Sequence, residues 1–287
     1  MKTKLLATLL VGTSLLTGCS TVSTKSESMV DISNKDKAIA VLNAIETGDS
    51  KAMAYVNATN YTQHNLGVAD GLAGFGEVLQ ALPKGSAKVD VVRAFEDGDF
   101  VFTHTDYNFF GPKVGFDLFR FENGKIVEHW DNLAVKATQP NPSGRSQLDG
   151  TTAIVDLDKT AANKALVADF VDTILINGQY DKFGQFFDGD NYLQHNTAIA
   201  DGLSGLGQAL EAMAKQGITM EFSKTYKVLG EGNFVLAISE GTFAGKPTAY
   251  YDLFRVENGK IAEHWDVIET ILPKAQWKNS NGKFGNL

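Results

Sequence analysis

Asp117–Asp131 reads DLFRFENGKIVEHWD, and Asp252–Asp266 reads DLFRVENGKIAEHWD. The two stretches are identical at 13 of 15 positions. An earlier pair agrees in the same way, with YTQHNLGVADGL at Tyr61–Leu72 and YLQHNTAIADGL at Tyr192–Leu203. The period of 131–135 residues is too long for a solenoid repeat and has the length of a whole small domain. The sequence therefore predicts two tandem copies of one domain.

Each copy begins with helical patterns and continues with strand patterns. In the first copy, Lys35–Glu46 places apolar residues at helical spacing, and Gly48 follows where a helix would end. The later runs are rich in aromatic and β-branched residues and are separated by turn signals. The strongest of these signals is Asn123-Gly124, which predicts a β-hairpin. Helices followed by an antiparallel sheet predict an α+β domain.

Composition divides the chain into six expected segments. They are a lipoprotein signal peptide (1–18), a tether (19–34), the first domain (35–137), a linker (138–159), the second domain (160–273) and a tail (274–287). The linker is expected because prolines, glycines and polar residues gather in Gln139–Thr152. The polar tail is expected to be loose. Each domain is large enough to be stabilised by a packed core without disulfides.

The first residues have the pattern of an export signal. Two lysines precede a mostly apolar run at Leu5–Leu16, which is too short to span a bilayer as a mature helix. The run ends in LTGC at 16–19, which resembles a bacterial lipobox, and Cys19 is the only cysteine. Several acyl chains on Cys19 would anchor the chain, because each buried methylene contributes about 0.8 kcal/mol. Ser20 then favours the outer membrane in a Gram-negative cell. An ordinary signal peptide is the alternative.

The charge of the chain limits its partners. The formal charge is −8, and loss of residues 1–18, which hold two lysines and no acids, takes it to −10. An acidic chain without a basic cluster argues against nucleic acid as a partner. No second long apolar run follows the signal, so no further membrane span is expected.

Strand alternation brings candidate polar side chains together. His129 and Asp131 share one face of the last predicted strand of the first copy, and Asp117 and Phe119 share a face of the strand before it. If the face with Asp131 borders an apolar cavity closed by the helices, burial would raise the pKa of the carboxyl and suit it to acid and base work. A histidine or aspartate in a sheet is also often a hydrogen-bonded structural group, so that role stays open.

The succession Tyr-x-Gln-His-Asn, Ala-Asp-Gly, Asp-Leu-Phe-Arg and Asn-Gly-Lys-Ile-x-Glu-His-Trp-Asp resembles the SnoaL-like polyketide cyclase family of the nuclear-transport-factor-2-like (NTF2-like) superfamily. The resemblance covers 35–137 and 160–273. It implies cone-shaped α+β barrels, with helices packed on a curved antiparallel sheet around one deep pocket. In these cyclases an aspartate on the last strand is the acid and base of an intramolecular aldol condensation, and the matching residues are Asp131 and Asp266. The family implies no cofactor.

The resemblance and the alternation together define the candidate site residues. The catalytic candidates are the aspartates of the last strands and the nearby histidines, namely Asp131, His129, His64, His104, Asp266, His264 and His195. The candidates for ligand contacts are Asp106, Asp117, Glu240, Asp252, Phe119 and Phe254.

The two copies differ on one strand. Alignment places His104 opposite Ile238, and Asp106 opposite Glu240. The first copy therefore has an extra His–Asp pair there. If proton transfer requires such a pair, the first copy is the better candidate for chemistry, and the second would bind ligand or pack against it.

Three functions fit these residues. The first is a cofactor-independent enzyme of aldol, cyclase or isomerase type acting on a small carbonyl compound through Asp131. The second is non-catalytic binding of a small apolar ligand at the bacterial envelope. The third is a zinc or iron site using His64, His129 and either Asp131 or Asp70, but the spacing is not that of a local metal motif, so no metal is expected. By analogy with family dimers, the two copies are also expected to form an internal pseudodimer.

Overall fold

A computed structural model describes residues 32–287, which form one unit. The predicted signal peptide, Cys19 and most of the predicted tether lie outside these residues. None of the described helices is long and apolar enough to cross a membrane.

The first domain contains two helices and a five-stranded sheet. The helices are α1 (Asn34–Thr47) and α2 (Gly71–Ala81), with a 3₁₀ segment at Ser50–Tyr55 between them. The strands are β1 (Thr62–Gln63), β2 (Lys88–Asp97), β3 (Phe100–Asn108), β4 (Pro112–Glu122) and β5 (Lys125–Val135). The order in the sheet is β1-β5-β4-β3-β2, antiparallel except for the parallel pairing of β1 with β5.

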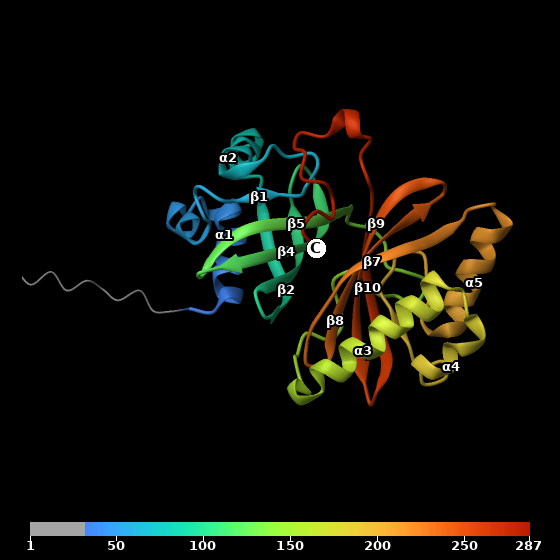
Figure 1. Ribbon diagram of the computed structural model, residues 1–287. Helices are drawn as coiled ribbons and strands as arrows, with labels where there is room; N and C mark the ends of the chain where they lie inside the picture. The colour runs from blue at the N-terminus through green and yellow to red at the C-terminus, as the bar shows by residue number, and fades with distance from the viewer. Residues whose placement is uncertain (1–31) are drawn as a thin grey trace, which may run out of the picture. The chain divides into compact units, whose positions relative to one another are not determined.

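The second domain repeats this order (Figure 1). Its helices are α3 (Thr160–Phe170), continued by a π-helical segment (Val171–Ile176), then α4 (Phe183–Phe186) and α5 (Gly202–Lys215). Its strands are β6 (Leu193–Gln194), β7 (Met220–Glu231), β8 (Phe234–Phe243), β9 (Lys246–Glu257) and β10 (Lys260–Thr270). Short 3₁₀ turns occur at Leu157–Lys159, Tyr180–Lys182 and Lys274–Gln276. The predicted α+β class with two tandem domains is confirmed.

Local sequence signals explain the main boundaries of the first domain. The Ser33 side chain accepts a hydrogen bond from the Asp36 backbone and begins α1, and Gly48 ends it with a φ of 71°. Asn123 and Gly124 have φ values of 50° and 71°, which is the left-handed pair that a two-residue hairpin turn needs. This turn sets the register in which Asp117 lies opposite Asp131.

The two faces of each sheet have different partners. In the first domain one face packs against α1, so that Val41 and Leu42 meet Phe119 and Ile126 in a single cluster. The opposite faces of the two sheets share one hydrophobic cluster, which we call the central cluster. Its largest fully buried members include Trp130 and Phe116 from the first sheet and Trp265 and Tyr251 from the second. The helix-covered face of each sheet therefore packs with its own helices in a separate cluster.

Candidate functional site

A cavity of about 70 Å³ lies in the first domain between the helices and the sheet. Its wall is mostly apolar and is supplied by α1, α2 and the strands. The polar groups that line it, apart from two tyrosines, are Gln63, Asn65, Asp117, His129 and Asp131. An apolar cavity with a few convergent polar groups is the usual form of a small-molecule site. Its volume suits a small compound or one end of a larger one.

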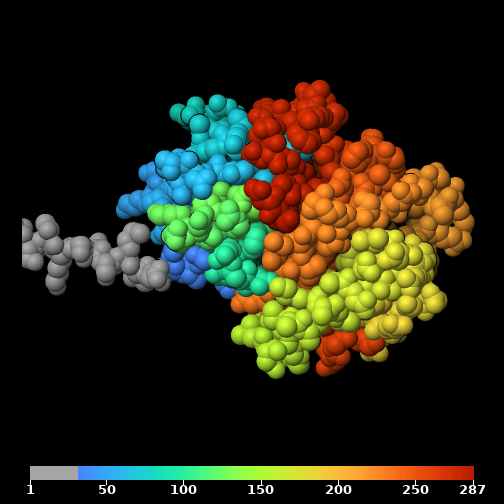
Figure 2. All heavy atoms as spheres, in the orientation of Figure 1, coloured from blue at the N-terminus to red at the C-terminus, as the bar shows by residue number. Residues whose placement is uncertain are grey.

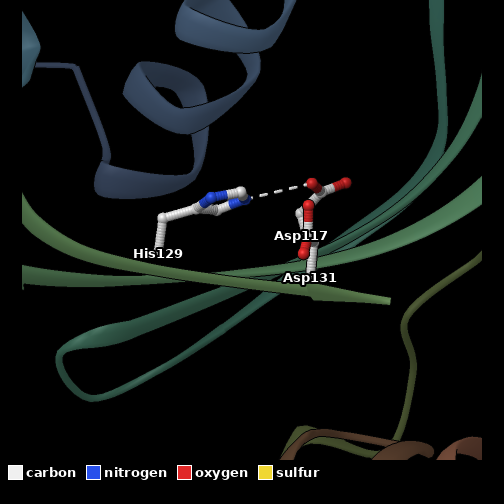
Figure 3. Close-up of side chains that lie close together, drawn as sticks. All are labelled: Asp117, His129 and Asp131. Carbon is white, nitrogen blue, oxygen red and sulfur yellow. Dashed lines mark hydrogen bonds and ion pairs between the residues drawn. The ribbon is translucent and has the colours of Figure 1, made fainter. Parts of the chain in front are cut away.

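His129 and Asp117 form an ion pair across β5 and β4. His129 Nε2 lies 3.1 Å from Asp117 Oδ1 (Figure 3). On the other side of the ring, Nδ1 lies 3.2 Å from Gln63 Oε1, which also accepts a hydrogen bond from the Asn65 backbone at 2.8 Å. Both ring nitrogens thus face oxygen acceptors. Asp117 and Gln63 therefore hold the imidazole from its two sides.

Tyr107 fixes the same carboxylate from β3. Its hydroxyl donates to Asp117 Oδ2 at 2.8 Å. Burial raises the pKa of Tyr107, and the charge of Asp117 raises it further, so the phenol stays protonated. Asp117 is therefore engaged by two donors and is suited to holding His129 in place.

Asp131 differs from Asp117 because one of its oxygens is free. Its side chain is buried, and Oδ2 accepts a hydrogen bond from Asn65 Nδ2 at 2.8 Å. Oδ1 is also buried but has no hydrogen-bond partner among residues 32–287. Because a buried acceptor without a partner is costly, an orphan atom in a cavity wall marks a place where a ligand would supply the missing contact.

The second domain repeats the polar group. His264 Nε2 lies 3.1 Å from Asp252 Oδ1, and Asn196 Nδ2 donates to Asp266 Oδ2 at 2.7 Å. Gln194 Oε1 lies 3.0 Å from His264 Nδ1. Burial raises the pKa of Asp266, and the Asp252 carboxylate adds to this rise while His264 opposes it. The two domains therefore share one hydrogen-bonded core of glutamine, asparagine, histidine and two aspartates.

The space around this polar group differs between the domains. Val41 and Val56 line the cavity of the first domain. By helix pattern and by distance from the repeated tyrosine, the corresponding residues are Phe170 and Phe187. Their rings pack 5.4 Å apart, and Phe170 also contacts Phe254 at 5.6 Å. Larger aromatic rings thus occupy the space that forms the cavity in the first domain.

Three atoms of each group also lie close enough to share a cation. The ligand atoms of Asp117, His129 and Asp131 lie within 4.8 Å of one another, as do those of the second-domain group. Carboxylate and imidazole ligands suit zinc or iron. His64, which the metal hypothesis included, is not part of this cluster.

The first domain is similar to a known domain family. Residues 38–129 match the family model of the SnoaL-like domain. The first domain is therefore similar to the SnoaL-like domain, and we call it the SnoaL-like domain for that similarity. No curated protein matches the chain.

Similar solved structures each cover only part of this chain. An NTF2-like protein of unknown function from Cytophaga hutchinsonii is 20% identical, covering 36% of this chain and 91% of its own, with a TM-score of 0.32. A SnoaL-like polyketide cyclase from Agrobacterium tumefaciens is 16% identical, with coverages of 37% and 91% and a TM-score of 0.30. An NTF2-like protein of unknown function from Burkholderia xenovorans is 15% identical, with coverages of 41% and 93% and a TM-score of 0.33.

Six of the candidate residues form the two polar groups, three in each domain. In the SnoaL-like domain Asp131, His129 and Asp117 line the cavity. Their counterparts in the second domain are Asp266, His264 and Asp252. Phe119 also lines the cavity and stacks on His129 with ring centres 4.8 Å apart, and Phe254 stacks on His264 at the same distance.

His64 and His195 do not join these groups, contrary to expectation. The His64 ring stacks on Trp130 at 4.6 Å, and the His195 ring stacks on Trp265 at 4.7 Å. These tryptophans belong to the central cluster on the far side of the sheets. The cause is local, because Gln63 pairs with His129 and faces the cavity, so the next side chain points the other way.

The additional polar pair of the SnoaL-like domain also lies away from the cavity. His104 is buried on the far face and accepts a hydrogen bond from Arg93 at 2.6 Å. Burial, with the nearby Arg93 charge, holds the pKa of His104 well below its usual range, so it stays neutral. Asp106 pairs with Lys136 instead of lining the cavity, and Glu240 accepts from the Tyr226 hydroxyl at 2.7 Å. The expectation that the first copy carries the chemistry is therefore supported by its cavity and not by this His–Asp pair.

Four polar residues of the site were not among the sequence candidates, and Tyr61 is one of them. Gln63 and Asn65 flank His64 in the repeated motif, and Tyr107 follows Asp106. The alternation of side chains along the strands could have identified them. Once Asp131 is assigned to the cavity, residues that pair with the same face of β5 from β1 must point into the cavity as well.

Proposed function

We propose that the SnoaL-like domain is a cofactor-independent acid/base enzyme of aldol, cyclase or isomerase type that acts on a small carbonyl compound. The supporting observation is the buried, unpartnered Oδ1 of Asp131 in the wall of an apolar cavity. We also propose that the chain is a bacterial lipoprotein anchored through Cys19, with a second domain of the same family.

The proposed reaction begins with proton removal beside a carbonyl group. Asp131 Oδ1 takes the proton from the α-carbon, and the electron pair of that C–H bond moves to form an enolate. Asp117 is held by His129 and Tyr107, whereas Oδ1 of Asp131 has no partner among the described residues, so Asp131 is the group left to act as base. The enolate then takes the proton back from Asp131 at another carbon, as in an isomerase. In an aldol cyclisation it attacks a second carbonyl carbon instead, and the alkoxide formed there takes the proton from Asp131.

Exchange of α-protons for deuterium tests this chemistry before the natural substrate is known. Small ketones and β-diketones are incubated with the protein in D₂O, and deuterium incorporation is followed by NMR. We expect Asp131→Asn to slow enzyme-dependent exchange at least ~100-fold, because removal of a general base typically costs that much. The matched variant Asp266→Asn, in the filled second domain, is expected to leave exchange near the wild-type rate. Equal exchange by wild type and Asp131→Asn would disprove the role of Asp131.

Binding without turnover is the second candidate function, and the mostly apolar wall of the cavity favours it. In that case the same ketones would bind, as detected by ligand-observed NMR, yet neither wild type nor Asp131→Asn would accelerate exchange. The two measurements together separate an enzyme from a carrier.

A further inference from the structure

The far face of each sheet carries a stacked His–Trp pair beside a buried glutamate. In the first domain we call His64, Glu128 and Trp130 the first clamp, and Arg120 pairs with its glutamate. In the second domain the equivalent residues are His195, Glu263 and Trp265, which we call the second clamp, and Arg255 pairs with Glu263 at 2.7 Å. Neither clamp lies in the cavity of the proposed enzyme.

The first clamp holds the end of the chain. His64 Nδ1 lies 2.8 Å from the Gly282 carbonyl oxygen, and Trp130 Nε1 donates to the Gly285 carbonyl at 3.1 Å. Asn286 Nδ2 donates to the Glu128 carboxylate. Figure 2 shows these C-terminal residues, in red, against the first domain. The tail, expected to be loose, is therefore bound, because its backbone carbonyls meet fixed donors.

The second clamp holds the segment between the domains in the same way. His195 Nδ1 lies 2.8 Å from the Ser146 carbonyl oxygen, and Trp265 Nε1 donates to the Asp149 carbonyl at 2.9 Å. In both segments the two bound carbonyls are three residues apart, at 146 and 149 and at 282 and 285. The residue just before the second carbonyl, Leu148 or Phe284, packs into the central cluster in each case.

The two segments are exchanged between the domains. Ser146–Gly150 follows β5 of the first domain but docks on the second clamp. Gly282–Asn286 follows β10 of the second domain but docks on the first clamp. We call these segments the first arm and the second arm. Reciprocal docking of the same element on the same surface is the arrangement of a two-fold dimer, here within one chain.

Asparagine side chains shortly before each arm add matched anchors. Asn281 Nδ2 donates to the Gln63 carbonyl at 2.9 Å, and Asn141 Nδ2 donates to the Gln194 carbonyl at 2.6 Å. The two glutamines whose backbone is bound in this way are the ones that support His129 and His264. Each arm is therefore tied to the strand that carries part of the polar group.

Both arms contain a glycine where the chain comes very close to its surroundings. A Cβ atom on Gly150 would lie 2.2 Å from Glu263 Oε1 and 2.8 Å from the Trp265 ring. A Cβ atom on Gly285 would lie 2.0 Å from the Asn281 carbonyl oxygen and 3.1 Å from His64. A side chain at either position would therefore disturb the seated arm.

We propose that each clamp is a peptide-recognition site whose partner is the arm of the other domain, and that this exchange holds the two domains in register. The recognised chemistry is a bent backbone segment with two carbonyls three residues apart, an apolar side chain before the second carbonyl and a small residue at the closest approach. This proposal does not depend on the proposed enzymatic activity.

Two matched variants of the full chain test the exchange, with amide hydrogen–deuterium exchange read by mass spectrometry. Gly285→Ala is expected to raise the exchange rate of amides in residues 279–287 at least ~10-fold, and to expose Trp130 in the other domain to acrylamide quenching. Gly150→Ala is expected to do the same for residues 141–151 and Trp265. Neither variant is expected to change exchange in the arm of the other. Unchanged arm exchange in both variants would overturn the proposal.

A synthetic peptide with the sequence of residues 277–287 tests recognition directly. Added to Gly285→Ala at about 1 mM, comparable to the effective concentration of a tethered segment, it is expected to restore protection of Trp130. The same peptide with alanine at position 285 is expected not to. Failure of the unmodified peptide to protect Trp130 would show that the clamp is not a recognition site.

Discussion

Tyr61 places a phenol in the cavity beside the two aspartates. Its hydroxyl accepts a hydrogen bond from Gln63 Nε2 at 3.3 Å and has no acceptor of its own among the described side chains. Burial raises the pKa of Tyr61, and the charges of Asp131 and Asp117 add to the rise, so the phenol keeps its proton at neutral pH. It is therefore suited to donating a hydrogen bond to a carbonyl oxygen that gains negative charge.

Replacing Tyr61 with phenylalanine tests this role. We expect Tyr61→Phe to lower the rate of α-proton exchange by ~100-fold with little change in ligand affinity, because a donor to a developing oxyanion acts mainly in the transition state. The control is Tyr192→Phe in the second domain, where the equivalent tyrosine faces a filled space. A loss of affinity without a loss of rate would assign Tyr61 to binding alone.

For single residues, the sequence correctly predicted which side chains share a face of a strand. Asp117, His129 and Asp131 lie together because each occupies the inward phase of a regular strand. His64 and His104 were predicted to lie in the site because histidines often act as acids and bases. The face of the sheet on which each side chain lies is set by strand register, and it is the opposite face. Their ring partners, Trp130 and Phe116, come from strands beyond the reach of local pattern.

Strand β10 carries a buried charge network around Glu263, on the face of the sheet away from the helices. Burial alone would raise the pKa of Glu263, but hydrogen bonds from His195 and Arg255 outweigh it and bring that pKa to about 2. A carboxyl whose pKa is lower in the folded state stabilises the fold above its unfolded pKa, and the contribution disappears as pH falls through the folded value. The relevant window therefore runs from about pH 4.5 down to about pH 2.

Urea unfolding at pH 7 and pH 2.5 measures this contribution. We expect Glu263→Gln to remove up to about 3 kcal/mol of the difference in unfolding free energy between the two pH values, from 1.36 kcal/mol per pKa unit. Glu257→Gln is the control, because Glu257 contacts the same arginine but is exposed, and exposed ion pairs contribute little. A pH dependence unchanged in Glu263→Gln would assign the acid sensitivity to other groups.

Elements with local signals were predicted well, and those defined by long-range pairing were not. The hairpin turn at Asn123-Gly124 placed β4 and β5 within a few residues. By contrast, β1 is only two residues long and exists because it pairs in parallel with β5. The π-helical segment after α3 leaves no mark in the sequence pattern, since one inserted residue keeps most of the apolar periodicity intact.

The membrane attachment proposed for the whole molecule rests on its N-terminus. We expect the wild-type chain, expressed in a bacterium fed labelled palmitate, to incorporate the label and to sediment with membranes. Cys19→Ser removes the only thiol and is expected to abolish both. Label retained in Cys19→Ser would disprove lipidation at this residue, and an unlabelled, soluble wild-type chain would favour an ordinary signal peptide.

The duplication was visible in the sequence, but the way the copies join was not. Identity between the repeats predicts two similar domains, and the structure has them. The proline- and glycine-containing stretch between them indicated a linker. Its carbonyls meet donors on distant residues, such as His195 and Trp265, which lie 49 and 116 positions away, and no local composition encodes these contacts.

The exchanged arms reverse a common rule of protein engineering. Connections between domains are normally where a chain accepts added residues or an inserted tag, because little there is ordered. Here the stretch from Asn141 to Gly150 must keep its spacing to reach both Gln194 and Trp265. Additional length would therefore be accepted more readily at an exposed hairpin such as Gly245, even though that turn lies within a folded domain.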